Sequence, residues 1–194
     1  MSEYMKKSEH IYDGKIITVT KDTVLLDNGY TVEREVVHHP GAVAIIPLNK
    51  TGEIIFVRQY RHSVKEALLE LPAGKLEQHE LPLDCAKREL AEEIGLTGRF
   101  TKITEFYTAP GFASEIIHLF LADDLTSAHA CKDEDEILSV ETHPLQDAVS
   151  MISIGSIKDA KTIIGVLMLQ SGLALRQELP SQAITYGVNN ETTD

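Results

Sequence analysis

The most informative segment of the chain reads Gly74-Lys-Leu-Glu-Gln-His-Glu80-Leu-Pro-Leu-Asp-Cys-Ala-Lys-Arg88-Glu89-Leu90-Ala-Glu92-Glu93-Ile-Gly95-Leu96. At about 100° per residue in a helix, the three glutamates Glu89, Glu92 and Glu93 fall within an arc of roughly 100°. A separate arc of roughly 80° carries the apolar residues, which are Leu83, Ala86, Leu90 and Ile94. One helix face therefore suits a core. The other holds like charges that repel one another, and a hard divalent cation with oxygen ligands would compensate them.

A solvated acidic face is the ordinary explanation for a glutamate-rich helix. Three features favour a site instead. Gly74 and Gly95 flank the helix, and Gly95 suits a left-handed C-cap. Arg88 can hold a carboxylate in place. The third feature is the spacing. The pattern resembles the Nudix box at every defined position: it has Gly74, then five residues, Glu80, then seven residues, and then the segment 88–96.

The resemblance implies a fold and a reaction class. The Nudix fold is an α/β/α sandwich around a mixed sheet, with the box forming a loop–helix–loop. Its members hydrolyse a nucleoside diphosphate linked to another moiety. We therefore expect an α/β enzyme with this sandwich, preceded by a short N-terminal antiparallel sheet.

Residues outside the box resemble the ADP-ribose pyrophosphatase branch. They are Glu70-Leu71-Pro72-Ala73-Gly74, Arg58-Gln59-Tyr60-Arg61 and Ala109-Pro110-Gly111-Phe112, with Pro110 fifteen residues after Gly95. The acidic stretch 133–136 and the segment Lys158-Asp159-Ala160-Lys161-Thr162 are similar too. This branch implies Mg²⁺-dependent hydrolysis of ADP-ribose to AMP and ribose 5-phosphate, with Mn²⁺ as a substitute metal.

The resemblance also implies the metal site. Glu89 and Glu93 would bind metal directly, the backbone carbonyl of Ala73 would complete the site, and Glu92 would bind or bridge a second ion. Arg88 would orient a carboxylate. The alternative, purely structural role for Arg88 is an intrahelical ion pair. Glu80 is either a structural partner of Arg88 or lies further from the metal.

A separate general base is expected, because carboxylates that bind metal lose basicity. The acidic stretch 133–136 has the character of a mobile loop, and the resemblance places a catalytic glutamate there. Glu134 and Glu136 are both candidates, with Glu134 slightly preferred.

Substrate contacts are expected upstream and downstream of the box. Guanidinium groups fit phosphate oxygens in a two-point fashion, which favours Arg58 and Arg61. Strand alternation places these two on opposite faces, so both need not enter one pocket. Glu70 and Gly111 belong to the matching motifs, and Glu115 could bind a ribose or the adenine. A plain strand-edge charge is an equal alternative for Glu115.

Composition fits one globular domain of 194 residues with 43% hydrophobic and 25% charged residues. The net charge of −12 argues against nucleic-acid binding, which needs a basic patch. The two cysteines, Cys85 and Cys131, form no disulfide framework. We expect no membrane-spanning segment and no signal peptide, and hence a cytoplasmic protein.

Hydrophobic patterning predicts strands first and helices late. Strands are expected at 15–20, 22–26, 30–37, 42–48, 54–60, 100–107, 115–122 and 136–142, and helices at 144–153 and 158–176, besides that of the box. The break at His39-Pro40-Gly41 divides the chain into an N-terminal β-meander (1–40), a Nudix domain (41–180) and a flexible tail (181–194). The meander is too small to fold alone. In the resembling branch it forms a domain-swapped homodimer, so we expect a homodimer here.

Two alternatives to ADP-ribose hydrolysis stay open. One is hydrolysis of another nucleotide sugar, of the GDP-mannose or ADP-glucose type. The other is a non-catalytic, ADP-ribose-sensing Nudix domain. Such sensors usually carry an eroded box or an added DNA-binding module, whereas this chain keeps every box carboxylate and is acidic.

Overall fold

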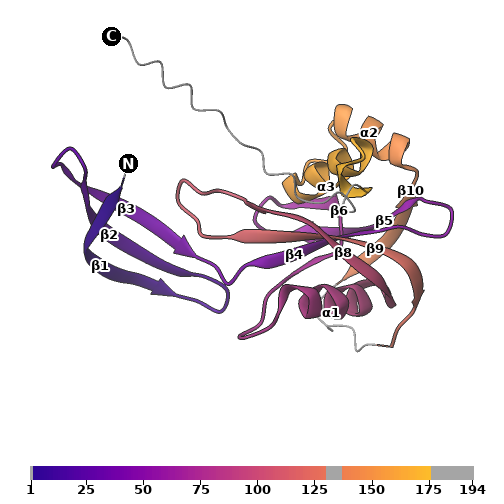
Figure 1. Ribbon diagram of the computed structural model, residues 1–194, viewed down its shortest axis with the longest axis horizontal. Coiled ribbons are helices and arrows are strands. Elements are labelled where there is room, and N and C mark those ends of the chain that lie inside the picture. The colour runs from indigo at the N-terminus through magenta and orange to yellow at the C-terminus, as the bar shows by residue number, and fades with distance from the viewer. Residues whose placement is uncertain (1, 130–136, 176–194) are drawn as a thin grey trace, which may run out of the picture.

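A computed structural model of the chain describes residues 2–129 and 137–175 (Figure 1). The first three strands form an antiparallel sheet in the order β1-β2-β3, with bounds Glu3–Asp13, Thr18–Leu26 and Thr31–His38. At the turn between β2 and β3, Gly29 has φ 87° and Tyr30 N–H donates to Asn28 Oδ1 at 3.1 Å. The Asp-Asn-Gly sequence thus makes the tight turn that it predicts, because this turn needs a residue with positive φ.

A mixed four-stranded sheet forms the centre of the molecule. Its order is β7-β4-β9-β8, and the bounds are β4 Ala42–Pro47, β7 Ala73–Lys75, β8 Leu96–Tyr107 and β9 Ile116–Ser127. Strand β4 runs parallel to β9 and antiparallel to β7, while β8 and β9 form an antiparallel pair. Residues 43–47 are all buried, as a continuous apolar run inside a covered sheet should be.

A second, antiparallel sheet has the order β10-β5-β6. Its strands are β5 Ile54–Arg61, β6 Glu66–Glu70 and β10 Leu138–His143. Residues 54–57 of β5 are buried, whereas Tyr60 near its end is exposed. The polar end of β5 therefore leaves the core and carries the motif Arg58-Gln59-Tyr60-Arg61.

Helices cover the two sides of these sheets, α1 (Pro82–Ile94) on one side and α2 (Leu145–Ser153) with α3 (Ala160–Gln170) on the other (Figure 1). One core cluster packs under α1, with Val43, Ile45, Cys85, Ala86, Leu90, Phe120 and Ala122 as its buried members. The larger cluster packs under α2 and α3, with Ile46, Phe56, Leu71, Leu119 and Val166 among its buried members. The predicted α/β/α sandwich is confirmed.

Several expected elements differ in extent. Strand β2 is one strand where two were expected, and β1, β6 and β7 were not predicted. Every residue of β1 is exposed, so its sequence lacks the in–out alternation that marks a half-buried strand. Strands β6 and β7 are only five and three residues long. Leu83, expected on the buried face of α1, is 39% exposed, because it lies in the first turn, ahead of the contact with the sheet.

In the part of the chain that the structure describes, none of the helices is long and apolar enough to cross a membrane.

Candidate active site

Helix α1 fixes the acidic side chains against the sheet. It begins with Pro82 in its first turn and ends at Gly95, whose φ of 69° lets its N–H bond the carbonyls of Leu90 and Ala91. Burial of the apolar face holds the helix down, and the adjacent Glu89 and Glu93 are then only 8% and 3% exposed. Charged groups are rarely this buried without compensation, and here Glu89 accepts a hydrogen bond from Arg88 and Glu93 accepts one from Ala73 N–H.

The segment before the box meets these carboxylates directly. Ala73 N–H donates to Glu93 Oε2 at 3.2 Å. A Cβ built on Gly74 would lie 1.9 Å from the carboxyl carbon of Glu89, so only glycine leaves room for this carboxylate. The first residue of the box is therefore a glycine for a steric reason, and β7 and α1 together form one acidic cradle.

Arg88 lies within the acidic cluster. Its Nε and Nη2 donate to Glu80 at 2.8 and 2.9 Å, and its Nη1 donates to Glu89 at 2.7 Å and to Glu92 at 2.9 Å. The hydrogen bond from Arg88 is the main reason why the pKa of Glu80 falls to about 2. The pKa of Arg88 is raised in turn, first by Glu80. The bonding pattern matches the structural partnership expected of Glu80.

The donor set suits a hard divalent cation. Glu89, Glu92 and Glu93 supply carboxylate oxygens, the ligands that Mg²⁺ and Mn²⁺ prefer. In the described ranges 2–129 and 137–175, no three acidic, histidine or cysteine side chains are arranged as a ready-made metal site, and the Arg88 guanidinium supplies positive charge to Glu89 and Glu92 instead. The carboxylates therefore fit a hard cation in their chemistry.

A second charged cluster adjoins the box from β5, β6 and α3. Arg61 Nε and Nη2 each donate to Glu70 at 2.8 Å, and Lys161 also donates to Glu70. Burial alone would raise the pKa of Glu70, but the hydrogen bonds from Arg61 and Lys161 outweigh it, and the pKa lies below its usual range. The pKa of Arg61 is raised by Glu70 first and also by Asp159 and Glu93. The negative charge of Glu93 therefore acts electrostatically on Arg61.

Arg58 belongs to a different neighbourhood. Its Nε donates to Glu141 Oε1 at 2.5 Å, on strand β10, and Glu141 also bonds His143 at 3.2 Å. Arg58 and Arg61 thus bond partners on opposite sides of β5, in keeping with strand alternation. Of the two arginines, Arg61 is the one whose pKa is raised by a box carboxylate, Glu93, after the larger effect of Glu70.

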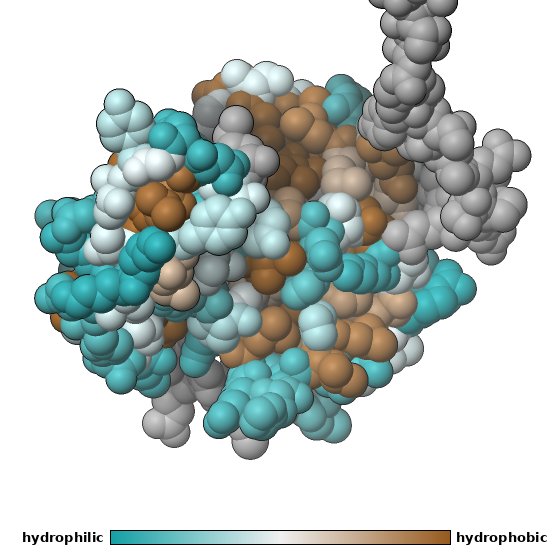
Figure 2. Space-filling view, turned by 60° about the vertical axis from the view of Figure 1, so that its left-hand side comes forward, coloured by the Kyte–Doolittle hydropathy of each residue, from teal (hydrophilic) through white to brown (hydrophobic). Residues whose placement is uncertain are grey.

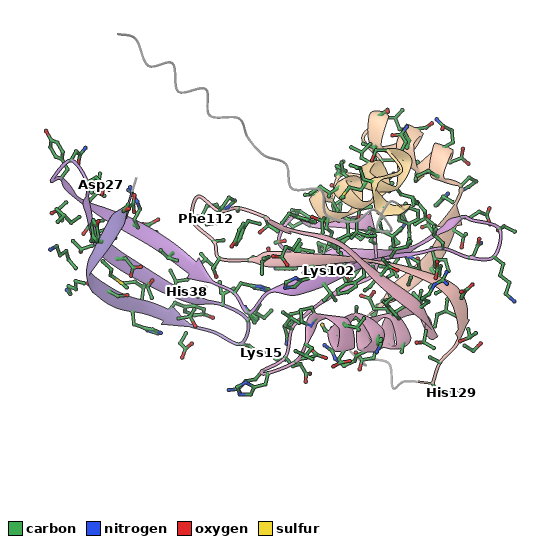
Figure 3. All side chains as sticks on the ribbon, viewed as in Figure 1. Lys15, Asp27, His38, Lys102, Phe112 and His129 are labelled. Atoms are coloured by element: carbon green, nitrogen blue, oxygen red, sulfur yellow. The ribbon has the colours of Figure 1, made fainter. Side chains whose placement is uncertain are left out.

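The β8–β9 loop places Gly111 and Glu115 next to the N-terminal sheet. Val37 N–H donates to Phe112 O at 2.8 Å, and Phe112 lies at the same end of the molecule as His38 (Figure 3). Glu115 accepts from Thr108 Oγ1 at 2.7 Å, and its Oε1 lies 3.7 Å from His39 Nδ1. A Cβ on Gly111 would meet nothing within 4 Å. The roles of Gly111, Glu115, Arg58, Arg61 and Glu70 in substrate binding remain predictions.

Glu134 and Glu136, the candidate bases, lie outside the described residues. Sequence reasoning missed Lys161 as an individual residue, although its segment was recognised as similar to the branch. A lysine two positions after a capping aspartate is common on helices, so only the fold shows that it contacts a buried carboxylate.

Residues 38–163 match the NUDIX domain family, and the chain belongs to that family. The identification made from 74–96 is confirmed, and the chain is a Nudix-family hydrolase. It is 43% identical over 173 residues to the ADP-ribose pyrophosphatase of Bacillus subtilis, covering 88% of this chain and 94% of that relative.

Other relatives have different names. The chain is 41% identical over 175 residues to the methanol dehydrogenase activator of Bacillus methanolicus, covering 89% of this chain and 95% of the relative. It is 31% identical over 182 residues to an Escherichia coli GDP-mannose pyrophosphatase, covering 79% and 95% respectively. A crystal structure of an ADP compounds hydrolase superposes with TM-score 0.80 at 20% identity, over 92% of this chain and 98% of that one. That likeness concerns the fold.

Proposed function

We propose that this protein hydrolyses the pyrophosphate of ADP-ribose to AMP and ribose 5-phosphate. The observation that carries the proposal is the buried pair Glu89 and Glu93, held against Gly74 and Ala73 in an intact box. The choice of ADP-ribose is supported by the 43% identity with the Bacillus subtilis ADP-ribose pyrophosphatase over most of both chains.

Under this proposal the cradle holds Mg²⁺, or Mn²⁺ in its place. Glu89 and Glu93 bind directly with the Ala73 carbonyl, and Glu92 serves a second ion. Bound metal would neutralise phosphate charge and lower the pKa of a coordinated water. Arg88 keeps Glu89 and Glu92 oriented through its two Nη1 hydrogen bonds.

The substrate is bound by residues around this cradle. Arg61, whose guanidinium is oriented by Glu70, contacts a phosphate. Arg58 is a second candidate for a phosphate contact, on the other side of β5. Gly111 and Glu115 belong to the loop that binds the nucleoside or the terminal ribose.

The general base in this proposal is Glu134 or Glu136, on the segment that precedes β10. The carboxylates on α1 are less basic once they bind metal, so a separate acceptor is required for the proton of the attacking water. We expect one of Glu134→Gln and Glu136→Gln to lose most of kcat with little change in KM, and the other to be nearly silent. Full activity in both variants would assign the base to the box glutamates instead.

The proposal includes a cytoplasmic homodimer joined through residues 1–40. Strand β1 is exposed along its whole length, and Val24 is the one buried hydrophobic residue among the described positions 2–40. A three-stranded sheet with so little core is not expected to be stable alone. A second copy of the chain would cover it.

Another nucleotide sugar is the alternative substrate, favoured by the relationship to a GDP-mannose pyrophosphatase. A non-catalytic ADP-ribose sensor would not need the intact carboxylate set. An activity assay separates these cases. The purified protein is incubated with Mg²⁺ and with ADP-ribose, ADP-glucose, GDP-mannose or 8-oxo-dGTP, and the products are separated by chromatography. We expect AMP to appear fastest from ADP-ribose. A faster reaction with GDP-mannose would select the alternative, and no reaction would favour the sensor.

A further inference from the structure

Glu70 is a buried carboxylate that joins two cations from different elements. The residue is 1% exposed. It accepts the Nε and Nη2 edge of Arg61 from β5 and the ammonium of Lys161 from α3. Lys161 is itself 11% exposed and also pairs with Asp159 Oδ2 at 3.1 Å. Two positive and two negative charges balance in this cluster, which is the condition under which such groups tolerate burial.

The first turn of α3 also forms a hydrogen bond with the backbone of Leu71, the residue after Glu70. Asp159 caps the helix by accepting from Thr162 N–H at 3.0 Å and from Thr162 Oγ1 at 2.6 Å. Thr162 Oγ1 in turn accepts from Leu71 N–H at 2.8 Å. Residues 70 and 71 are thus held by α3, three and two positions before Ala73, whose N–H donates to Glu93.

The geometry leaves one edge of Arg61 for a ligand. Its Nε and Nη2 bond Glu70, while Nη1 has no hydrogen-bond partner among the described residues. The Arg61 side chain is 39% exposed. A guanidinium held along one edge and open along the other is pre-organised for an anionic oxygen, because less side-chain entropy is lost on binding.

We propose that Lys161 and Glu70 are positioning residues that present Arg61 to a phosphate of the substrate. Lys161 shares the negative charge of Glu70, so Arg61 is oriented without its whole charge being neutralised. Glu70 then acts through Arg61 and does not contact the substrate. This inference rests on the proposed function, since it assigns a specific task to two residues of that site.

The test is Lys161→Met, which keeps an unbranched side chain shorter by one heavy atom and removes its charge. KM for ADP-ribose should rise about tenfold while kcat stays within about threefold, because a ground-state phosphate contact is weakened. Lys158→Met is the matched control: Lys158 lies three residues earlier and pairs with exposed Glu66 at 2.7 Å, so its KM should equal that of the wild type. Lys161→Arg should restore most of the lost affinity. Wild-type KM in Lys161→Met would overturn the proposal.

A double-mutant cycle separates positioning from general destabilisation. If Lys161 acts through Arg61, adding Lys161→Met to Arg61→Gln causes no further loss of kcat/KM. Losses that multiply would overturn the proposal. Should Lys161→Met fail to fold, Glu70→Gln/Lys161→Met removes both buried charges together and should fold with the same rise in KM; a wild-type KM there would also contradict it.

Turnover is not the only readout. Calorimetric titration of wild type and Lys161→Met with inorganic pyrophosphate and Mg²⁺ should show about tenfold weaker binding in the variant. A wild-type protein that releases no AMP from ADP-ribose contradicts the proposed function. Equal pyrophosphate affinities in the two proteins contradict the positioning role alone.

Discussion

At the scale of single residues, the arrangement of the site depends on the absence of a side chain at Gly74. Gly74 does not have a positive φ, so its backbone conformation does not require glycine. Its requirement is spatial, since the Glu89 carboxylate occupies the place where a Cβ would be. Glycine here leaves room for the Glu89 carboxylate, a role distinct from that of Gly95, which supplies the left-handed turn at the end of α1.

Gly74→Ala should therefore abolish most activity and leave the fold intact. The atoms that the new Cβ meets belong to the end of a flexible side chain, so Glu89 can move aside and the free energy of unfolding should change by less than about 1 kcal/mol. The displaced carboxylate no longer fits the cradle, and kcat should fall at least about tenfold. Thermal melting and steady-state kinetics on the same sample check both parts. Wild-type kcat would contradict the role given to Glu89.

At the scale of elements, an ion pair fastens the loop of the box to its helix. Glu80 bonds Arg88 through both carboxylate oxygens, and Glu77 N–H donates to Glu80 Oε2 at 3.0 Å. Leu81, which precedes α1, provides no side-chain cap. The Glu80–Arg88 pair therefore holds the start of the helix against the loop where a capping side chain would otherwise do so.

The stability of the protein should depend on the ionisation of Glu80. Its pKa is lowered to about 2 in the folded protein, so the stabilisation is complete above the usual value of 4.5 and is lost as the pH falls towards 2. Glu80→Gln should cost about 2 kcal/mol at pH 7. The difference from wild type should shrink between pH 4.5 and 2 in urea titrations. A difference that does not change over this range would show that the carboxylate charge contributes nothing.

The sequence predicted the elements whose signal is local. The Nudix box, the Asp27-Asn28-Gly29 turn and the buried strand β4 follow from spacing, turn chemistry and apolar runs. It did not predict β1, β6 and β7. Strand β1 is exposed along its whole length, β6 and β7 are very short, and β7 pairs with β4, which lies far earlier in the chain. The same limit explains the site: Arg88 could be placed beside its glutamates, whereas the contact of Lys161 with Glu70, 91 residues apart, depends on tertiary structure.

At the scale of the whole molecule, the N-terminal sheet stands apart from the sandwich (Figure 1). Figure 2 brings this end forward and shows hydrophobic side chains among hydrophilic ones on its surface. Its exposed large hydrophobic residues are Tyr4, Met5, Ile11, Tyr12, Ile16 and Tyr30. Described hydrogen bonds join β3 to the β8–β9 loop, so the sheet adjoins the loop expected to bind substrate.

The protein should be a dimer in solution, because burial of these residues by a second copy would stabilise the sheet. Light scattering should give twice the 21.5 kDa mass of one chain. Removal of residues 1–40 should give a monomeric or insoluble protein. It should also lose activity if the partner subunit supplies substrate contacts. A mass of about 21.5 kDa for the full chain would refute the dimer.

The central claim is that the carboxylates of α1 bind the metal required for pyrophosphate hydrolysis, and the turnover of Glu93→Gln tests it most directly. Glutamine keeps the shape of the side chain and the oxygen that accepts from Ala73 N–H, but it removes the charge that a metal ligand needs. With ADP-ribose and saturating Mg²⁺, we expect kcat to fall by at least about a hundredfold, with the melting temperature unchanged or raised as repulsion among the glutamates is relieved. Turnover close to wild type would contradict the account.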